Sequence, residues 1–227
     1  MKNLLIVTLL ITCLTGVSAQ TTQNRTIGSF TGIKVAEGVN VYLKKGDKES
    51  LRVEVTGTDP DNVVTEVSGS YLKVHMREAR YRGNIEAKVY VTYVHLDKLS
   101  ASSAGSIYSE EAVKSNSIDI SASSAGEIEV ALDAESVTAS ASSAAELELS
   151  GKTKSLSTDA SSAGEIDAYN LEATKVQAEA SSGASIKISV TTELTAHASS
   201  GGSIRFRGNP NKSVTDSSSG GSVKKSS

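Results

Sequence analysis

The sequence has few of the residues on which disulfide-stapled domains and most compact enzymes depend. Its 227 residues include one cysteine, three histidines, two prolines and no tryptophan, and aromatic residues make up only 4%. The single cysteine, Cys13, excludes an intramolecular disulfide framework. His75, His95 and His197 are scattered and have no zinc-binding spacing. A Gly-x-Ser-x-Gly elbow, a phosphate loop and a dinucleotide fingerprint are all missing, so the sequence predicts no catalytic residues and no cofactor.

Strong charge and long apolar runs are also missing. The net charge of −3 implies no polyanionic partner, so we expect no nucleic-acid binding. The apolar stretch Leu4–Leu14 is too short for a membrane span. With Lys2 before it and an Ala-x-Ala-like cleavage site ending at Ala19, it predicts a secretory signal peptide over residues 1–19. The alternative is a lipoprotein anchored at Cys13, although the preceding Leu-Ile-Thr matches such a site poorly. We therefore expect an exported protein that is periplasmic, on the outer-membrane surface or extracellular.

Small residues are abundant, and they recur in a repeat. The segment ASSAGEI at residues 160–166 has six further variants between residues 101 and 223. Successive copies lie 18 to 21 residues apart, and a fixed period of this size over several copies is typical of a solenoid. The first serine of each pair occupies Ser102, Ser123, Ser142, Ser161, Ser181, Ser199 and Ser218.

Both sides of each serine pair alternate apolar and polar residues with period two, which indicates strands with one buried face. We therefore predict an all-β fold, a parallel β-helix or β-solenoid of about 19-residue coils over residues 100–225. Each coil should contain two short strands that meet at a Ser-Ser-Ala-Gly corner. Ala160 and Ala180 should face a narrow interior. Because alanine replaces the corner glycine at Ala145 and Ala184, tight packing rather than positive φ should explain the small residues there.

The first hundred residues are less regular. We expect residues 20–29 to form a flexible lead-in because they are polar. Residues 30–99 alternate with period two between turn signals, so they predict a less regular N-terminal β region. This region could form degenerate, longer coils of the same solenoid, or a small sandwich that caps it.

The order of these features resembles a known family. The chain has Phe30-x-x-Ile33-x-Val35 before Gly38-Val39-Asn40-Val41, and the repeated Ser-(Ala/Gly)-Gly-x-Ile corners come later. In this it is similar to the secreted, Bacteroidetes-type family described as putative auto-transporter adhesin, head GIN domain. The resemblance covers roughly residues 26–225 and implies an exported, all-β, β-helix-like protein. It transfers no catalytic residues.

The charge pattern gives a first candidate site. At the outward positions after the corners, three successive repeats carry only carboxylates, and the following repeats carry Lys187, Arg205 and Lys224. Stacking at about 4.8 Å would place the carboxylates in two columns. Such oxygen-rich columns could bind Ca²⁺, or they could form a solvated face. The candidate metal ligands are Glu127, Glu129, Glu146, Glu148, Glu165 and Asp167.

Residues 71–93 give a second candidate site because tyrosines and basic residues mix there. Exposed tyrosines can stack on sugars, and arginines can pair with acidic glycans. The alternative is sheet packing beside a solvated basic loop. The candidate ligand-binding residues are Tyr71, Arg77, Arg80, Tyr81, Arg82, Tyr90 and Tyr93.

Two function classes remain open from the sequence. The first is a non-catalytic envelope or cell-surface protein, an adhesin-like scaffold that binds a glycan or a protein. The second is a polysaccharide-acting lyase or glycosidase, because β-helices also carry such enzymes. The short, regular coils favour binding because they lack the long loops that would form a cleft. The sequence leaves the oligomeric state open.

Overall fold

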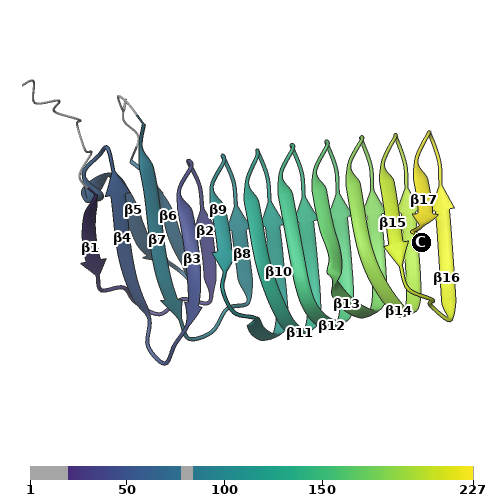
Figure 1. The fold of residues 1–227 in the computed structure, drawn as a ribbon, viewed down its shortest axis with the longest axis horizontal. Helices are drawn as coiled ribbons and strands as arrows, with labels where there is room; N and C mark the ends of the chain where they lie inside the picture. Colours follow the sequence, from purple (N-terminus) through teal and green to yellow (C-terminus); the bar gives the residue numbers. More distant parts are fainter. Residues whose placement is uncertain (1–19, 78–83, 227) are drawn as a thin grey trace, which may run out of the picture.

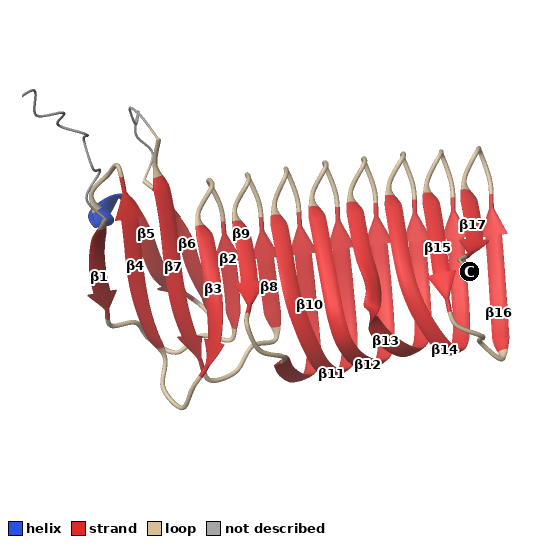
Figure 2. Ribbon diagram, viewed as in Figure 1, coloured by secondary structure: helices blue, strands red, loops and turns tan. Residues whose placement is uncertain are grey.

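The structure is a computed structural model that describes residues 20–77 and 84–226. The predicted signal peptide and the candidate residues Arg80, Tyr81 and Arg82 lie outside this range. The described residues form an elongated stack of coils in which the strands belong to one 17-stranded sheet folded back on itself (Figure 1). Figure 2 shows strands along the whole stack, with one short 3₁₀ turn, η1 (Pro60–Asn62), at its N-terminal end. The predicted all-β solenoid is confirmed. Within the described residues, no helix is long and apolar enough to cross a membrane.

The coils have two broad faces, which we name from the corner. The upstream face holds the segments that precede each corner, and the downstream face holds those that follow it. Four long strands contribute to both faces: β11 (Glu127–Ala141), β12 (Glu146–Ala160), β13 (Glu165–Ala180) and β14 (Ser185–Ala198). The downstream face also contains β1 (Thr21–Arg25), β4 (Ser50–Thr56), β7 (Glu86–Tyr93), β3 (Asn40–Lys45), β9 (Ser106–Ser109), β15 (Ser203–Arg207) and β17 (Ser222–Lys225). The upstream face also contains β5 (Val63–Ser68), β6 (Tyr71–Met76), β2 (Gly32–Val35), β8 (Lys98–Ala101), β10 (Val113–Ala122) and β16 (Lys212–Ser217).

Each Ser-Ser-Ala-Gly corner is a tight turn with two left-handed residues. Ser162 has φ 49° and Ala163 has φ 60°, and the Gly164 N–H donates to the Ser161 carbonyl at 2.9 Å. Positive φ at both central residues is the type I′ geometry, which matches the twist of paired strands. Gly164 itself does not have positive φ. A Cβ on Gly164 would lie 2.5 Å from the Ala141 carbonyl oxygen of the preceding coil. The prediction that tight packing explains the small residue at this position is therefore confirmed.

The opposite end of each coil differs from the prediction of two separate short strands. The strands β11 to β14 continue through a bend, so the upstream and downstream segments are joined without a second corner. Differences in repeat length are absorbed near this bend. Between β13 and β14 the register shifts in the segments Ala168–Glu172 and Ala173–Lys175. Nearer the corner, Glu165 still pairs with Ser185 and Ala180 with Ala198. The rows beside the corners therefore stay aligned although the period varies.

The interior is thin and aliphatic. Ala160 and Ala180 are 1% and 2% exposed, which confirms the predicted inward positions. Small upstream alanines face larger downstream side chains such as Ile166 and Ile186, so the two faces can approach closely. No buried side-chain nitrogen or oxygen among the described residues lacks a hydrogen-bond partner. The core therefore combines aliphatic packing with satisfied buried side-chain polar groups.

The N-terminal region combines the two predicted arrangements. Strands β2 and β3 form a coil whose corner has positive φ at Glu37 and Gly38, as in the later repeats. In space this coil lies between the β6–β7 pair and the β8–β9 coil, so the coils do not follow chain order. Strands β1, β4 and β5 pair antiparallel with their neighbours and end the stack. Coil geometry is therefore already present in β2 and β3, before the regular repeats that begin near residue 100. The expected flexible lead-in is replaced by β1 over residues 21–25.

Candidate functional site

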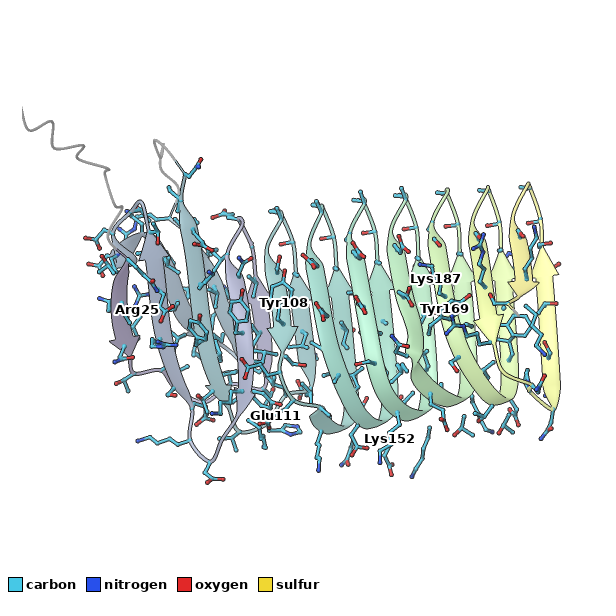
Figure 3. All side chains as sticks on the ribbon, viewed as in Figure 1. Arg25, Tyr108, Glu111, Lys152, Tyr169 and Lys187 are labelled. Carbon is cyan, nitrogen blue, oxygen red and sulfur yellow. The ribbon has the colours of Figure 1, made fainter. Side chains whose placement is uncertain are left out.

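The downstream face carries rows of outward side chains, and we call the one that runs from Arg52 to Lys224 the axial row. It runs across neighbouring strands, so its members are about 4.8 Å apart along the stack. Figure 3 shows two of its members, Tyr108 and Lys187, on the front of the stack. In spatial order, the row contains Arg52, Tyr90, Tyr42, Tyr108, Glu129, Glu148, Asp167, Lys187, Arg205 and Lys224.

The tyrosine block of the axial row is a stack of rings. The Tyr42 ring centroid lies 5.2 Å from that of Tyr90 and 5.4 Å from that of Tyr108, with interplanar angles of 21° and 26°. The Arg52 guanidinium covers the Tyr90 ring at 4.2 Å from its centroid. Because both faces of Tyr42 and of Tyr90 are covered by neighbouring groups, these two rings offer no free platform on which a sugar could stack. The block presents ring edges and hydroxyl groups to solvent.

The acidic block follows directly. The six predicted carboxylates form two columns in register: Glu127, Glu146 and Glu165 beside Glu129, Glu148 and Asp167. The Tyr108 hydroxyl donates to the carboxylate of Glu127 at 3.0 Å. Glu127 is the first carboxylate of its column, so this hydrogen bond joins the tyrosine block to the acidic block. Burial, together with the neighbouring Glu127 carboxylate, raises the pKa of Tyr108, so this hydroxyl stays protonated and remains a donor at neutral pH.

Lys187 closes the acidic block at its other end. Its Nζ atom lies 2.8 Å from Glu165 Oε1 and 3.0 Å from Asp167 Oδ2. Hydrogen bonds to Glu165 and then to Asp167 raise the pKa of Lys187, although partial burial opposes this shift. Among the described residues, no group of three or more His, Asp or Glu side chains is arranged so that it could hold a metal ion. The calcium interpretation of the columns therefore gains no geometric support.

The basic block completes the row. Lys187, Arg205 and Lys224 are register partners in three successive coils. Beside them, Arg207 stacks over the Tyr169 ring at 4.0 Å, and the Tyr169 hydroxyl lies 2.6 Å from Ser226 Oγ. Figure 3 shows Tyr169 on the same face, below Lys187. Sequence reasoning missed Tyr169 because it lies where the register shifts, and no residue-type pattern marks that position.

The described residues of the second predicted site are not gathered on one face. The Tyr71 ring lies on the upstream face, where Lys34 Nζ approaches it at 4.2 Å, whereas Tyr90 belongs to the downstream axial row. Tyr93 is buried in the core at 2% exposed. Arg77 lies after β6, and its backbone N–H donates to the Asn62 carbonyl at 2.7 Å. Of the candidate tyrosines among the described residues, only Tyr90 therefore takes part in the axial row.

A groove of about 750 Å³ follows the bend at the lower edge, where Figure 3 places Lys152. Opposite charges alternate along it from coil to coil: Lys114, Asp133, Lys152 and Glu172 are successive register partners. Lys152 Nζ lies 3.6 Å from Asp133, so the charges of this edge can neutralise one another within the chain. The lower edge thus contrasts with the axial row, in which like charges adjoin.

Comparisons with solved structures agree with the fold. A structure described as a putative adhesin from Bacteroides fragilis NCTC 9343 matches with a TM-score of 0.82 and 19% identity, covering 92% of this chain and 98% of that one. A second putative adhesin, from Parabacteroides distasonis ATCC 8503, gives 0.71 and 16%, covering 93% and 98%. A putative lipid binding protein from the same organism gives 0.65 and 21%, covering 92% and 97%. At these identities the likeness shows the fold alone.

No curated protein matches the chain. A family model does match, over residues 29–210, which is most of the chain. Its description agrees with the resemblance seen in the order of the sequence motifs. The protein therefore belongs to the family described as "Putative auto-transporter adhesin, head GIN domain".

Proposed function

We propose that this protein is an exported, non-catalytic scaffold of the adhesin type, and that the downstream face is its binding surface. The observation that carries the proposal is the axial row, in which a tyrosine, an acidic and a basic block follow one another in register. The family's adhesin description supports a binding role. The signal-peptide pattern over residues 1–19 supports export.

The physical argument is one of pre-organisation. Each side chain of the row except Lys224, which lies on the terminal strand β17, projects from a strand that is hydrogen-bonded to both neighbours. The position of such a side chain therefore costs little further ordering when a partner binds. Charges at a regular spacing of about 4.8 Å favour a partner whose own charges are ordered. The row is a ladder of outward side chains, and the groove of the lower edge is lined by charges that can pair within the chain, so both features favour binding over catalysis.

A protein surface is a better partner for this row than a neutral glycan. Stacking of sugars needs free aromatic faces, and both faces of Tyr42 and of Tyr90 are covered by neighbouring groups. The exposed groups are instead carboxylates, ammonium and guanidinium groups and phenol hydroxyls. The name of the Parabacteroides lipid binding protein suggests another ligand class, but the interior of this chain is filled by its own aliphatic side chains.

The test is binding of the purified chain, residues 20–227, to an array of neutral, sulfated and sialylated glycans and to a panel of extracellular matrix proteins. The key variant is Glu148→Lys in the axial row. The matched control is Asp159→Lys, because Asp159 is an exposed carboxylate of the same strand, β12, on the upstream face. We expect at least a tenfold loss for Glu148→Lys and no change for Asp159→Lys. Equal effects of both variants, or no binding to any probe, would count against the proposal.

A further inference from the structure

In the last six members of the axial row, residues at equal distances from the centre carry charges of opposite sign. These members are Glu129, Glu148, Asp167, Lys187, Arg205 and Lys224, three acidic residues followed by three basic ones. The centre of this pattern lies between Asp167 and Lys187. A surface with such an order is complementary to itself after its direction is reversed.

We propose that a second copy of this chain docks on the downstream face with its long axis reversed. A two-fold axis parallel to the strands, passing between Asp167 and Lys187, generates this arrangement. It sets Glu129 opposite Lys224 of the second copy, Glu148 opposite Arg205, and Asp167 opposite Lys187. Each contact occurs twice, as in any isologous interface. This inference rests on the proposed use of the face for binding and names the partner.

The chain alone does not balance the charges of these two blocks. On the lower edge, opposite charges alternate, and pairs such as Lys152 with Asp133 form within the chain. In the axial row, Glu129 adjoins Glu148, and Arg205 adjoins Lys224, so neighbours of like charge repel. The ion pairs of Lys187 relieve this repulsion at the boundary only.

The second acidic column also fits the reversed copy. The same two-fold axis sets Glu127 opposite Ser222, Glu146 opposite Ser203, and Glu165 opposite Ser185, because these serines continue that column. Serine side chains are short and can donate hydrogen bonds to carboxylates. The column therefore meets neither a like charge nor a bulky side chain.

The expected interface is small. Six coils at about 4.8 Å and strand segments of about five residues at roughly 3.3 Å give about 500 Å² per copy. A total of about 1,000 Å² lies at the low end for specific complexes. The dimer should therefore be weak and sensitive to salt, because its contacts are ion pairs at the surface.

The experiment is sedimentation equilibrium of residues 20–227 at 50 mM and 500 mM NaCl, between 1 and 200 µM protein. We expect a dimer at low salt whose dissociation constant rises at least tenfold at high salt. Glu148→Lys and Arg205→Glu should each abolish it, and the double variant Glu148→Lys/Arg205→Glu should restore it, because the exchanged charges again face each other. The mismatched double variant Glu148→Lys/Lys224→Glu should stay monomeric. Thermal unfolding shows whether each variant is folded.

A wild-type chain that is monomeric at 200 µM in 50 mM NaCl would overturn the proposal. So would a folded Glu148→Lys/Arg205→Glu variant that stays monomeric, or a dimer that Arg205→Glu leaves intact. The wider binding function is tested separately on the glycan and protein panel. A monomer that still binds a panel ligand through Glu148 would remove only the dimer, whereas a dimer without any panel ligand would remove only the external partner.

Discussion

At the scale of single residues, Lys187 is the point at which the acidic block meets the basic one. Its side chain is 28% exposed and contacts Glu165 and Asp167. Lys187→Met should lower the free energy of unfolding by about 1 kcal/mol, because it leaves two adjacent carboxylates without their shared cation. Lys152→Met is the matched control, since Lys152 is 73% exposed and its ion pair is longer. Urea unfolding at pH 7 measures both, and an equal loss in the two variants would contradict the special role of Lys187.

The pH dependence of this stabilisation has a definite sign. The pKa of Lys187 is raised in the folded chain above its ordinary value of 10.5. A group with a raised folded pKa stabilises fully below its unfolded pKa and loses this contribution as the pH rises through the folded value. The difference between wild type and Lys187→Met should therefore be constant from about pH 7 to 9.5 and shrink above about pH 10.5. A difference that disappears between pH 7 and 9 would show that another group is responsible.

Ala160 tests the thin interior. Ala160→Leu should overpack the coil and lower the free energy of unfolding by about 1–3 kcal/mol. Ser157→Leu, at an exposed position of the same strand, adds a similar side chain outside the core and should change stability by less than about 0.5 kcal/mol. Thermal unfolding of the two variants makes the comparison. Equal melting temperatures would mean that Ala160 does not face the interior.

At the scale of one element, the corner turn favours small residues at two adjacent positions for different reasons. One position has positive φ, and the next has little space for a Cβ. Ala163 has positive φ, and the later coils place Gly183, Gly201 and Gly220 at this position. Ala163→Gly should therefore stabilise the chain by about 0.5–1 kcal/mol, because glycine has no Cβ strain there. Gly164→Ala, one residue later, should destabilise it because the new Cβ meets the preceding coil. Opposite shifts in melting temperature are expected, and shifts of the same sign would contradict the type I′ assignment.

The repeated coils show which features of the structure the sequence can predict. The corner, the inward alanines and the acidic columns follow from an unbroken repeat, since neighbouring coils are also neighbours in sequence. The tyrosine block does not follow from it. Tyr42, Tyr90 and Tyr108 become adjacent only because the β2–β3 coil lies between coils formed later in the chain. No local pattern encodes that order, and for the same reason the sequence grouped Tyr90 with Tyr71 and Tyr93.

At the scale of the whole molecule, the regular coils are interchangeable units. Stability of such a stack is approximately a sum over coils and their nearest-neighbour contacts. Deletion of residues 142–160 removes one coil and should leave a folded, shorter chain, because the coils on either side can take the same register. Deletion of residues 142–151 alone should prevent regular stacking. Circular dichroism and a cooperative thermal transition distinguish the two, and an unfolded product of the whole-coil deletion would show that the coils are not equivalent.

The position of the β2–β3 coil also sets the order of events in folding. This coil is synthesised first, yet both of its spatial neighbours come from later parts of the chain, and the β8–β9 coil that continues the stack is complete only at Ser109. Pairing of the β2–β3 coil with its neighbours must therefore close long loops. Such closure is slow and cannot finish before the later strands have been synthesised. From Val113 onward each new coil meets a finished template. During synthesis, which starts at the N-terminus, we expect folding to pause until the β2–β3 coil has paired with its later neighbours. The following coils should then fold in chain order.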